Sequence, residues 1–307
     1  MDLANSAPVA GAAILAVMSR VRTLAGRLAG AALLLLSGAG LAAADVMEGW
    51  GAYEAGDYAR ALELFSDDAV AGDPEAQYAL GWLYGNGMGV PQDYAAALMW
   101  YERSARQGNM DAQNSAGFIH DLGLAGPPDT DMAEFWYGEA ASQGSIVAQN
   151  NLAYRWSLDG RNLDEALDLI RNVVRTERSN SAYLDTLGWV LYQLDRFQDA
   201  IPPLCEAVKL EPGHPELRVH LGDAYWQVGR DLDAHYQWGR ALRLLSEPEA
   251  LSEDGRLFVR TRPPSWRQSL EERLASGLSR RDDLTPSEAP PAAVERSFTD
   301  ECAVPTS

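Results

Sequence analysis

Short motifs in this sequence return at a fixed interval of 36 residues. The pair Ala76-Gln77 occurs again at 112–113 and at 148–149. Single positions keep the same step, namely Gly72, Gly108 and Gly144; Ala61, Ala97 and Ala133; and Asp57, Asp93 and Asp129. Repetition with a period of about 20–50 residues is the signature of a chain built from stacked copies of one structural unit. Each unit has to bury its apolar face against its neighbours, so the sequence predicts an array of repeats.

The stretch from 75 to 108 shows the unit most clearly. Two segments with helical spacing are separated by the turn Gly85-Asn86-Gly87-Met88-Gly89. The first segment contains Tyr78 and Tyr84, and the second contains Tyr94 and Tyr101. Apolar residues at i, i+3, i+4 and i+7 give each helix one apolar face. We therefore expect a pair of helices, with the glycines ending one helix and turning into the next.

Later in the chain the interval shortens to 34 residues. Ala166, Ala200 and Ala234 follow this step, and Leu187-Gly188 returns as Leu221-Gly222. The distance from the landmark glycine to the landmark alanine also falls, from 16 residues in the unit at 75–108 to 12 residues in the later ones. It is 12 in the first pair at 45–72 as well. Small residues at these positions would let the two helices of a pair approach closely.

The 36-residue unit resembles the Sel1-like repeat, and the 34-residue unit resembles the tetratricopeptide repeat. The first match is nearly complete over 75–108 and poorer in the next unit, where Ala116 and His120 replace a leucine and a tyrosine. In the later part the family landmarks fall on Leu187-Gly188, Ala200, Ala207 and Pro212. These resemblances imply an all-α fold, a right-handed α-solenoid of stacked antiparallel helix pairs, with Sel1-like repeats first, tetratricopeptide repeats after them and a C-terminal capping helix.

The patterns divide the chain into five segments. We expect a signal peptide at 1–44, a Sel1-like half at 45–160, a tetratricopeptide half at 161–245, a loop and capping helix at 246–278, and a disordered tail at 279–307. The loop is expected at 246–262 and the capping helix around Trp266, Leu270, Leu274 and Leu278. Because the 36-residue and 34-residue steps overlap at 148–166, we expect one continuous solenoid rather than two independent domains.

The N-terminal 44 residues have the order of a secretory signal. Arg20, Arg22 and Arg27 precede an apolar run at 28–36, and small residues lead to Ala44, the expected cleavage point. Met18 stands just before the basic part and is the expected true start. We therefore expect a periplasmic protein, with an inner-membrane protein anchored by an uncleaved signal as the alternative. Export also permits a disulfide between the only two cysteines, Cys205 and Cys302, and the alternative is a buried Cys205 with a free thiol in the tail.

The sequence contains no recognisable catalytic motif. The only lysine, Lys209, follows a valine, which excludes a Walker A loop, and Val90 stands where a G-x-G-x-x-G loop needs glycine. The four histidines are spread over separate units without ligand spacing. We accordingly expect no enzyme, no cofactor and no metal site.

The resemblance implies a binding face on the first helix of each pair. By position it consists of Asp185, Trp189, Tyr192, Gln193, Val219, Asp223, Trp226 and Gln227, with Trp82 and Phe118 at the corresponding place in the Sel1-like units. Aromatic residues among polar ones suit a binding surface. Packing of each aromatic against a neighbouring helix is the alternative.

The leading hypothesis is a non-catalytic periplasmic scaffold or adaptor that binds a protein or peptide. The acidic residues of the binding face favour a basic or mixed-charge partner over an acidic one. The net charge of −19 argues against nucleic acid or an anionic membrane surface as the main partner, and ordinary solubility is the alternative explanation of this charge. The apolar run at 28–36 is too short for stable insertion into a membrane. The first alternative is an envelope accessory protein that binds peptidoglycan or another glycan through its tryptophans. The second is a hydrolase, because a few Sel1-like proteins are described as hydrolases. Those proteins resemble cysteine-rich arrays, and the presence of only two cysteines here argues against this alternative.

Overall fold

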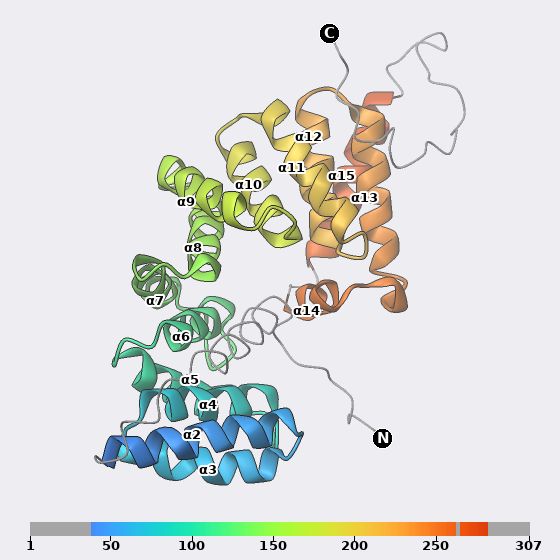
Figure 1. The fold of residues 1–307 in the computed structure, drawn as a ribbon. Helices are drawn as coiled ribbons and strands as arrows, with labels where there is room; N and C mark the ends of the chain where they lie inside the picture. Colours follow the sequence, from blue (N-terminus) through green and yellow to red (C-terminus); the bar gives the residue numbers. More distant parts are fainter. Residues whose placement is uncertain (1–37, 262–264, 282–307) are drawn as a thin grey trace. The chain divides into compact units, whose positions relative to one another are not determined.

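The computed structural model describes residues 38–261 and 265–281 of the 307. Every regular element in these ranges is a helix (Figure 1). The prediction of an all-α fold of stacked helix pairs is therefore confirmed. The predicted signal peptide lies mostly outside the described residues, although its last part, 38–44, already forms the beginning of α2 (Gly38–Glu54). The start at Met18 and the tail beyond 281 lie outside them as well, whereas 279–281, which we expected in the tail, end α15 (Ser265–Arg281).

Contacts between Cα atoms divide the chain into two compact units, with the boundary between Leu152 and Ala153. The first unit contains three helix pairs and the start of a further helix: α2 (Gly38–Glu54), α3 (Tyr58–Ala71), α4 (Pro74–Asn86), α5 (Tyr94–Ala105), α6 (Met110–Leu122), α7 (Thr130–Ser142) and the beginning of α8 (Ile146–Asp159). Each helix packs mainly on its pair partner and on the next helix along the chain. The boundary falls inside α8, within the region where the two sequence periods overlap.

The second unit continues the pairs and then adds a C-terminal segment. It contains the end of α8, then α9 (Leu163–Thr176), α10 (Ser181–Gln193), α11 (Phe197–Leu210), α12 (Pro215–Gln227), α13 (Asp231–Leu244), the 3-10 turn η2 (Pro248–Ala250), α14 (Glu253–Thr261) and α15 (Ser265–Arg281). The strongest packing is within the pairs α10–α11 and α12–α13.

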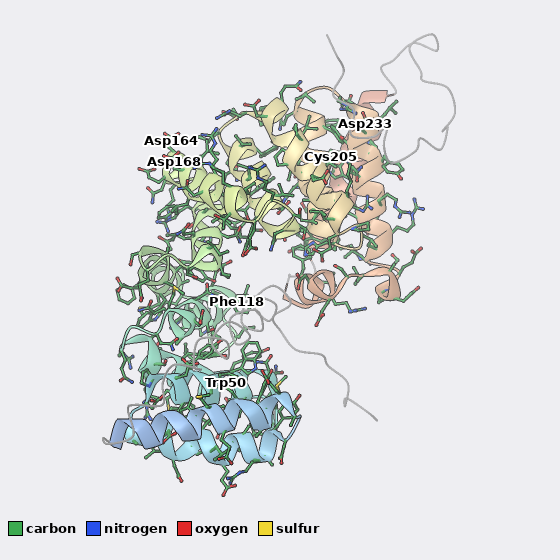
Figure 2. All side chains as sticks on the ribbon, viewed as in Figure 1. Trp50, Phe118, Asp164, Asp168, Cys205 and Asp233 are labelled. Carbon is green, nitrogen blue, oxygen red and sulfur yellow. The ribbon has the colours of Figure 1, made fainter. Side chains whose placement is uncertain are left out.

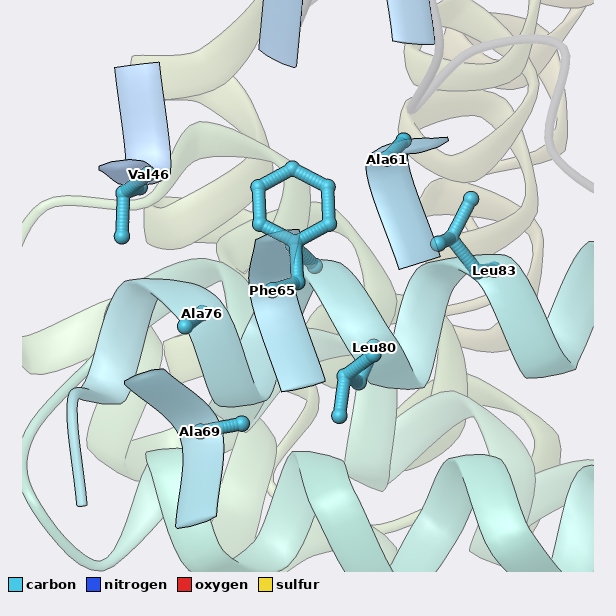
Figure 3. Packing of buried hydrophobic residues seen from close by; sticks show 8 residues of the cluster. Val46, Ala61, Phe65, Ala69, Ala76, Leu80 and Leu83 are labelled. Carbon is cyan, nitrogen blue, oxygen red and sulfur yellow. The ribbon is translucent and has the colours of Figure 1, made fainter. Parts of the chain in front are cut away.

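The recurring alanines lie where two helices of a pair touch. Ala61, Ala97 and Ala133 on the second helices of the first unit are completely buried, and so are Ala166 and Ala200 in the second. Around Ala61, the ring of Phe65 on α3 lies between Val46 of α2 and leucines of α4 (Figure 3). The repeated residues of the sequence are thus core residues of successive pairs.

The landmark glycines face a large side chain on the partner helix. A Cβ atom added at Gly81 would lie 2.5 Å from the ring of Tyr101. One added at Gly188 would lie 2.4 Å from the side chain of Leu204. Real Cβ atoms do not approach heavy atoms so closely, so any side chain here would separate the helices. The glycines at 49, 117 and 222 are equally close to a partner, which confirms the expected close approach.

The recurring aspartates start the helices. The side chain of Asp57 accepts a hydrogen bond from the backbone N–H of Arg60 at 3.1 Å, and that of Asp93 accepts one from Ala96 at 2.9 Å. Asp129 does the same for Met132 at 3.0 Å. An N-terminal cap of this kind contributes about 1 kcal/mol, because the first N–H groups of a helix have no partner within it.

The glycine-rich turn at 85–89 ends a helix, as predicted. Gly85 still belongs to α4, whereas Gly87 caps it with φ 66°, a left-handed conformation that favours glycine. The N–H of Met88 donates to the carbonyl of Leu83 at 2.9 Å. The loop therefore satisfies the last carbonyl groups of α4.

One sequence prediction is wrong. We expected a loop at 246–262, but α14 occupies 253–261. Phe258 of this helix is buried, with its ring 5.4 Å from that of His214, and Ser252 N–H donates to the carbonyl of Gly213 at 3.1 Å. The helix has only nine residues and contains Gly255, so it is stabilised by this docking on the start of α12 rather than by its own propensity. The capping helix is confirmed at 265–281, where Leu270 is completely buried.

Candidate binding face on the first helices

In the second unit, the first helices of successive pairs contact one another through polar and aromatic side chains. These side chains come from α8, α10 and α12. The capping helix α15 contacts α12 through an ion pair as well, that of Arg273 with Asp223. We call this set the first-helix face, which consists of Tyr154, Asp185, Trp189, Tyr192, Gln193, Glu216, His220, Asp223 and Gln227.

The centre of the first-helix face is a buried pair of Asp185 and His220. Both residues are only 5% exposed. The Nδ1 atom of His220 lies 2.9 Å from one carboxylate oxygen of Asp185 and 3.0 Å from the other. Glu216 stands on the other side of the ring, with its carboxylate 4.0 Å from Nε2. Tyr154 of α8 donates its hydroxyl proton to Glu216 at 2.8 Å, so three helices meet here.

Trp189 is stacked inside this arrangement. Its ring is parallel to that of Tyr192, with centroids 4.7 Å apart, and nearly parallel to that of His220, at 4.0 Å. Both rings stack on the indole, so the half-buried Trp189 makes aromatic contacts with α10 and α12 of the protein itself.

Tyr192, Gln193 and Gln227 occupy the outer part of the first-helix face. Gln227 is exposed and donates its side-chain N–H to the hydroxyl of Tyr192 at 3.2 Å. Gln193 donates to the carbonyl of Ser157 at 2.9 Å. Burial raises the pKa of Tyr192, and the hydrogen bond from Gln227 opposes that rise. Tyr192 is therefore a neutral hydroxyl at ordinary pH, with its aromatic edge half-exposed.

Asp223 is engaged by the capping helix. Its carboxylate accepts the indole N–H of Trp238 at 2.9 Å and pairs with Arg273 of α15 at 3.1 Å. Burial raises the pKa of Asp223, while the charge of Arg273 lowers it. This carboxylate consequently holds the cap in place.

The remaining predicted residues of the second unit are less accessible. Val219 is buried at 3% exposure, which makes it a core residue. Trp226 is half-buried, with its ring centroid 5.6 Å from that of Trp238 and 5.9 Å from that of His235.

The two predicted aromatics of the first unit behave differently from each other. Trp82 is 7% exposed and donates its indole N–H to the hydroxyl of Tyr53 at 3.0 Å. Phe118 on α6 is half-buried (Figure 2). They belong to a first-helix surface of their own unit, in which Asn151 also donates to Asn114 at 3.0 Å.

Four residues of the first-helix face and its cap were not predicted from the sequence. Tyr154 could have been found, because it stands 36 residues after Phe118 and 72 after Trp82. Glu216, His220 and Arg273 carry no periodic signal, since no equivalent residue precedes them at the repeat interval.

The described residues offer no group of three histidines, cysteines, aspartates or glutamates that could hold a metal ion. Cys205 is buried on α11 (Figure 2), with its sulfur 3.8 Å from the hydroxyl of Tyr225. Its predicted partner Cys302 lies outside the described residues, so this disulfide stays a prediction. Over the described part of the chain, no helix has the length and apolar character needed to cross a membrane.

Antiparallel helix pairs joined by short turns, with landmark glycines at the pair contact, define an α-helical repeat protein of the solenoid class. The family models agree in detail. The Sel1 repeat model matches 74–109 and 111–145, and the tetratricopeptide repeat model matches 186–247. The chain is thus a repeat protein in which Sel1 repeats are followed by tetratricopeptide repeats, and repeats of both kinds are typical of scaffolds for protein–protein interaction.

A solved structure with a TM-score above 0.5 shows the same fold at low sequence identity. A protective antigen of uropathogenic Escherichia coli strains with an SLR fold is 19% identical, with a TM-score of 0.53 over 83% of this chain and 66% of that one. A Sel1 repeat protein from Oxalobacter formigenes is 23% identical, with a TM-score of 0.48 over 64% of this chain and 84% of that one. No curated protein matches the sequence.

Proposed function

We propose that the protein is a non-catalytic scaffold or adaptor of the periplasm, which binds a protein or peptide partner along the first-helix face. The observation that carries the proposal is the pair of Tyr192 and Gln227. They stand on successive first helices, they are accessible, and a hydrogen bond of 3.2 Å fixes one against the other. A surface that is already ordered loses little entropy when a partner binds.

The chemistry of the first-helix face favours a protein over a sugar. Glycan binding by tryptophan requires an open aromatic face, whereas the ring of Trp189 is already stacked with the rings of Tyr192 and His220. Amide and hydroxyl groups such as those of Gln227 and Tyr192 are suited to hydrogen bonding with a peptide. The aromatic edges provide apolar contact area beside them.

The overall charge favours a basic or mixed-charge partner. The chain carries a net charge of −19. Such a field accelerates the encounter with positively charged proteins and repels acidic ones. Asp185 and Asp223 are already paired within the protein, so the attraction arises from the whole surface rather than from these two carboxylates.

Photo-crosslinking from one position on a first helix and one position on a second helix tests the proposal. A crosslinking residue at Gln227 should capture a defined envelope protein in living cells, whereas the same residue at Gln198, which is exposed on the second helix α11, should not capture it. With that partner purified, Gln227→Arg should weaken binding by about tenfold, which is about 1.4 kcal/mol, and Gln198→Arg should change it little. Equal capture from both positions, or sedimentation with purified cell-wall sacculi that depends on Gln227, would contradict the proposal.

A further inference from the structure

His220 stands where three first helices of the second unit meet. Asp185 and Trp189 face it from α10, Glu216 lies one turn away on its own helix α12, and Tyr154 of α8 reaches it through Glu216. The ring is 5% exposed, so water contributes little to its environment. Its state of protonation is therefore decided by these neighbours.

The positions of the two carboxylates favour a positively charged imidazole ring, because one accepts a hydrogen bond from Nδ1 and the other lies at ion-pair distance from Nε2. A neutral ring has one N–H and one bare nitrogen. If Nδ1–H donates to Asp185 at 2.9 Å, a bare Nε2 faces the carboxylate of Glu216 at 4.0 Å, and two electron-rich groups oppose each other. A protonated ring carries N–H groups on both sides and satisfies both carboxylates.

The face of Trp189 adds a third favourable contact. Its ring lies 4.0 Å from the imidazole, with an angle of 17° between the planes. The face of an indole attracts a cation within about 6 Å of its centroid. Asp223, the remaining charged group near the ring on α12, is itself paired with Arg273 of the capping helix.

We propose that His220 is a proton-dependent clamp that holds α10 and α12 together in its charged form and releases them when it loses its proton. The clamp controls the spacing between Tyr192 on α10 and Gln227 on α12. It thereby regulates partner binding at the first-helix face, and this part rests on the proposed function. When His220 is protonated the face is ordered for binding, and when His220 is neutral the face loosens.

The electrostatics agree with this geometry. Burial lowers the pKa of His220, but the charge and hydrogen bond of Asp185 and the charges of Glu216 and Asp223 raise it, and the net shift is upward. A histidine whose pKa is higher in the folded state stabilises that state fully below its unfolded pKa of about 6.5. The contribution is then lost as the pH rises through the higher folded value.

Histidine NMR of the full chain tests the clamp directly. The chain has four histidines, so the His220 ring signal is the one that disappears in His220→Gln. It should titrate above about 6.5, the value of an unperturbed histidine. Asp185→Asn, which keeps the shape and removes the charge, should move the titration downward. A His220 signal that titrates at or below that value in the wild-type protein would overturn the proposal.

Unfolding at two pH values supplies the second readout. Each unit of upward pKa shift makes the unfolding equilibrium constant about tenfold smaller at pH 6 than at a pH well above the folded pKa. His220→Gln should abolish this His220-dependent difference. His120→Gln is the matched control, because His120 also pairs with a carboxylate, that of Glu102 at 3.0 Å, but lies in the first unit. Retention of the full pH dependence in His220→Gln would overturn the clamp.

Measurements of partner binding distinguish a failure of the clamp from a failure of the proposed function. Both readouts above use the chain alone, so they can fail while the crosslinking from Gln227 still succeeds. If the clamp titrates as expected, the affinity for the captured partner should fall as the pH rises through the measured titration of His220 in the wild-type protein and not in His220→Gln. An affinity with the same pH dependence in both proteins would overturn the regulatory role.

Discussion

The two units of this protein join their helix pairs with different chemistry. In the first unit, neutral amides bridge successive repeats, since Gln107 donates to Gln77 at 2.8 Å and Gln143 donates to Gln113 at 2.6 Å. The ion pair of His120 with Glu102 also joins two repeats of this unit, but it is only partly buried. In the second unit, a fully buried ion pair of Asp185 and His220 joins successive repeats. Amide contacts do not titrate, whereas ionic ones do. The comparison indicates that the same architecture can place either a neutral amide or a titratable pair at the buried contact between repeats.

The units nevertheless share the contact within a pair, and breaking that contact should have the largest effect. Gly188→Leu should lower the free energy of unfolding by more than about 3 kcal/mol, because its side chain would overlap Leu204. Gly81→Leu should cost as much in the first unit. Gly239→Leu is the control, since an added Cβ there meets nothing within 4 Å. Urea unfolding measures all three, and a loss for Gly239→Leu as large as the others would contradict the packing argument.

The predicted disulfide between Cys205 and Cys302 should stabilise only the second unit, because both cysteines belong to it. If Cys205 and Cys302 pair after export, the purified protein has no free thiol until it is reduced and two afterwards. Reduction should lower the free energy of unfolding by about 2–3 kcal/mol, because the unfolded chain gains freedom. Cys302→Ser should behave like the reduced protein. Two reactive thiols in the denatured, unreduced protein would exclude the bond.

The amide bridge should be costly to break but indifferent to pH. Gln113 is buried at 3% exposure, and its side chain both donates to the carbonyl of Ala105 at 3.1 Å and accepts from Gln143. Gln113→Ala should therefore cost about 1–2 kcal/mol through unsatisfied groups, equally at pH 6 and pH 9. Thermal unfolding at the two values measures this. A cost that changes with pH would remove the contrast with His220.

The smallest effect is expected at the helix starts, where the units again agree. Asp93→Ala in the first unit and Asn180→Ala in the second should each cost about 1 kcal/mol, because each side chain accepts a backbone N–H at the first turn. Asp131→Ala serves as the comparison, since Asp131 lies inside the first turn of α7 but is not its capping residue. Differential scanning calorimetry resolves such differences, and equal effects for all three would argue against specific caps.

The sequence predicts the helix pairs well because their determinants are local and repeated. A landmark glycine, a buried alanine and a capping aspartate each recur at a fixed step, as at Gly81, Ala97 and Asp93. The partner of Asp185 could not be predicted in this way. His220 is 35 residues away, and no earlier repeat has a histidine at the equivalent position. Its contact with Asp185 therefore arises from the way in which α10 and α12 stack.

The wrong loop prediction has the same origin. Residues 253–261 carry a weak helical preference and two acidic residues in the first turn, and their helix is stabilised by contacts with Gly213 and His214, some 40 residues earlier. The single-copy C-terminal segment provides no second example from which such docking could be inferred. Prediction therefore succeeds where the chain repeats itself and fails where it does not.

The contact between a landmark glycine and a large residue on the partner helix also shows that the length of a repeat can change while the packing within the pair stays the same. The partner follows the glycine by 20 residues in the pair Gly81–Tyr101 and by 16 in Gly188–Leu204, yet the approach is equally close. The four additional residues are absorbed by the turn between the helices. The turn between the two helices of a pair can therefore differ in length without altering the contact between them. Pro127 and Pro128 are exposed in the turn before α7. A short peptide tag inserted between them would lie outside the packed helix contacts, so it would allow detection of the protein without altering the packing of the helix pairs.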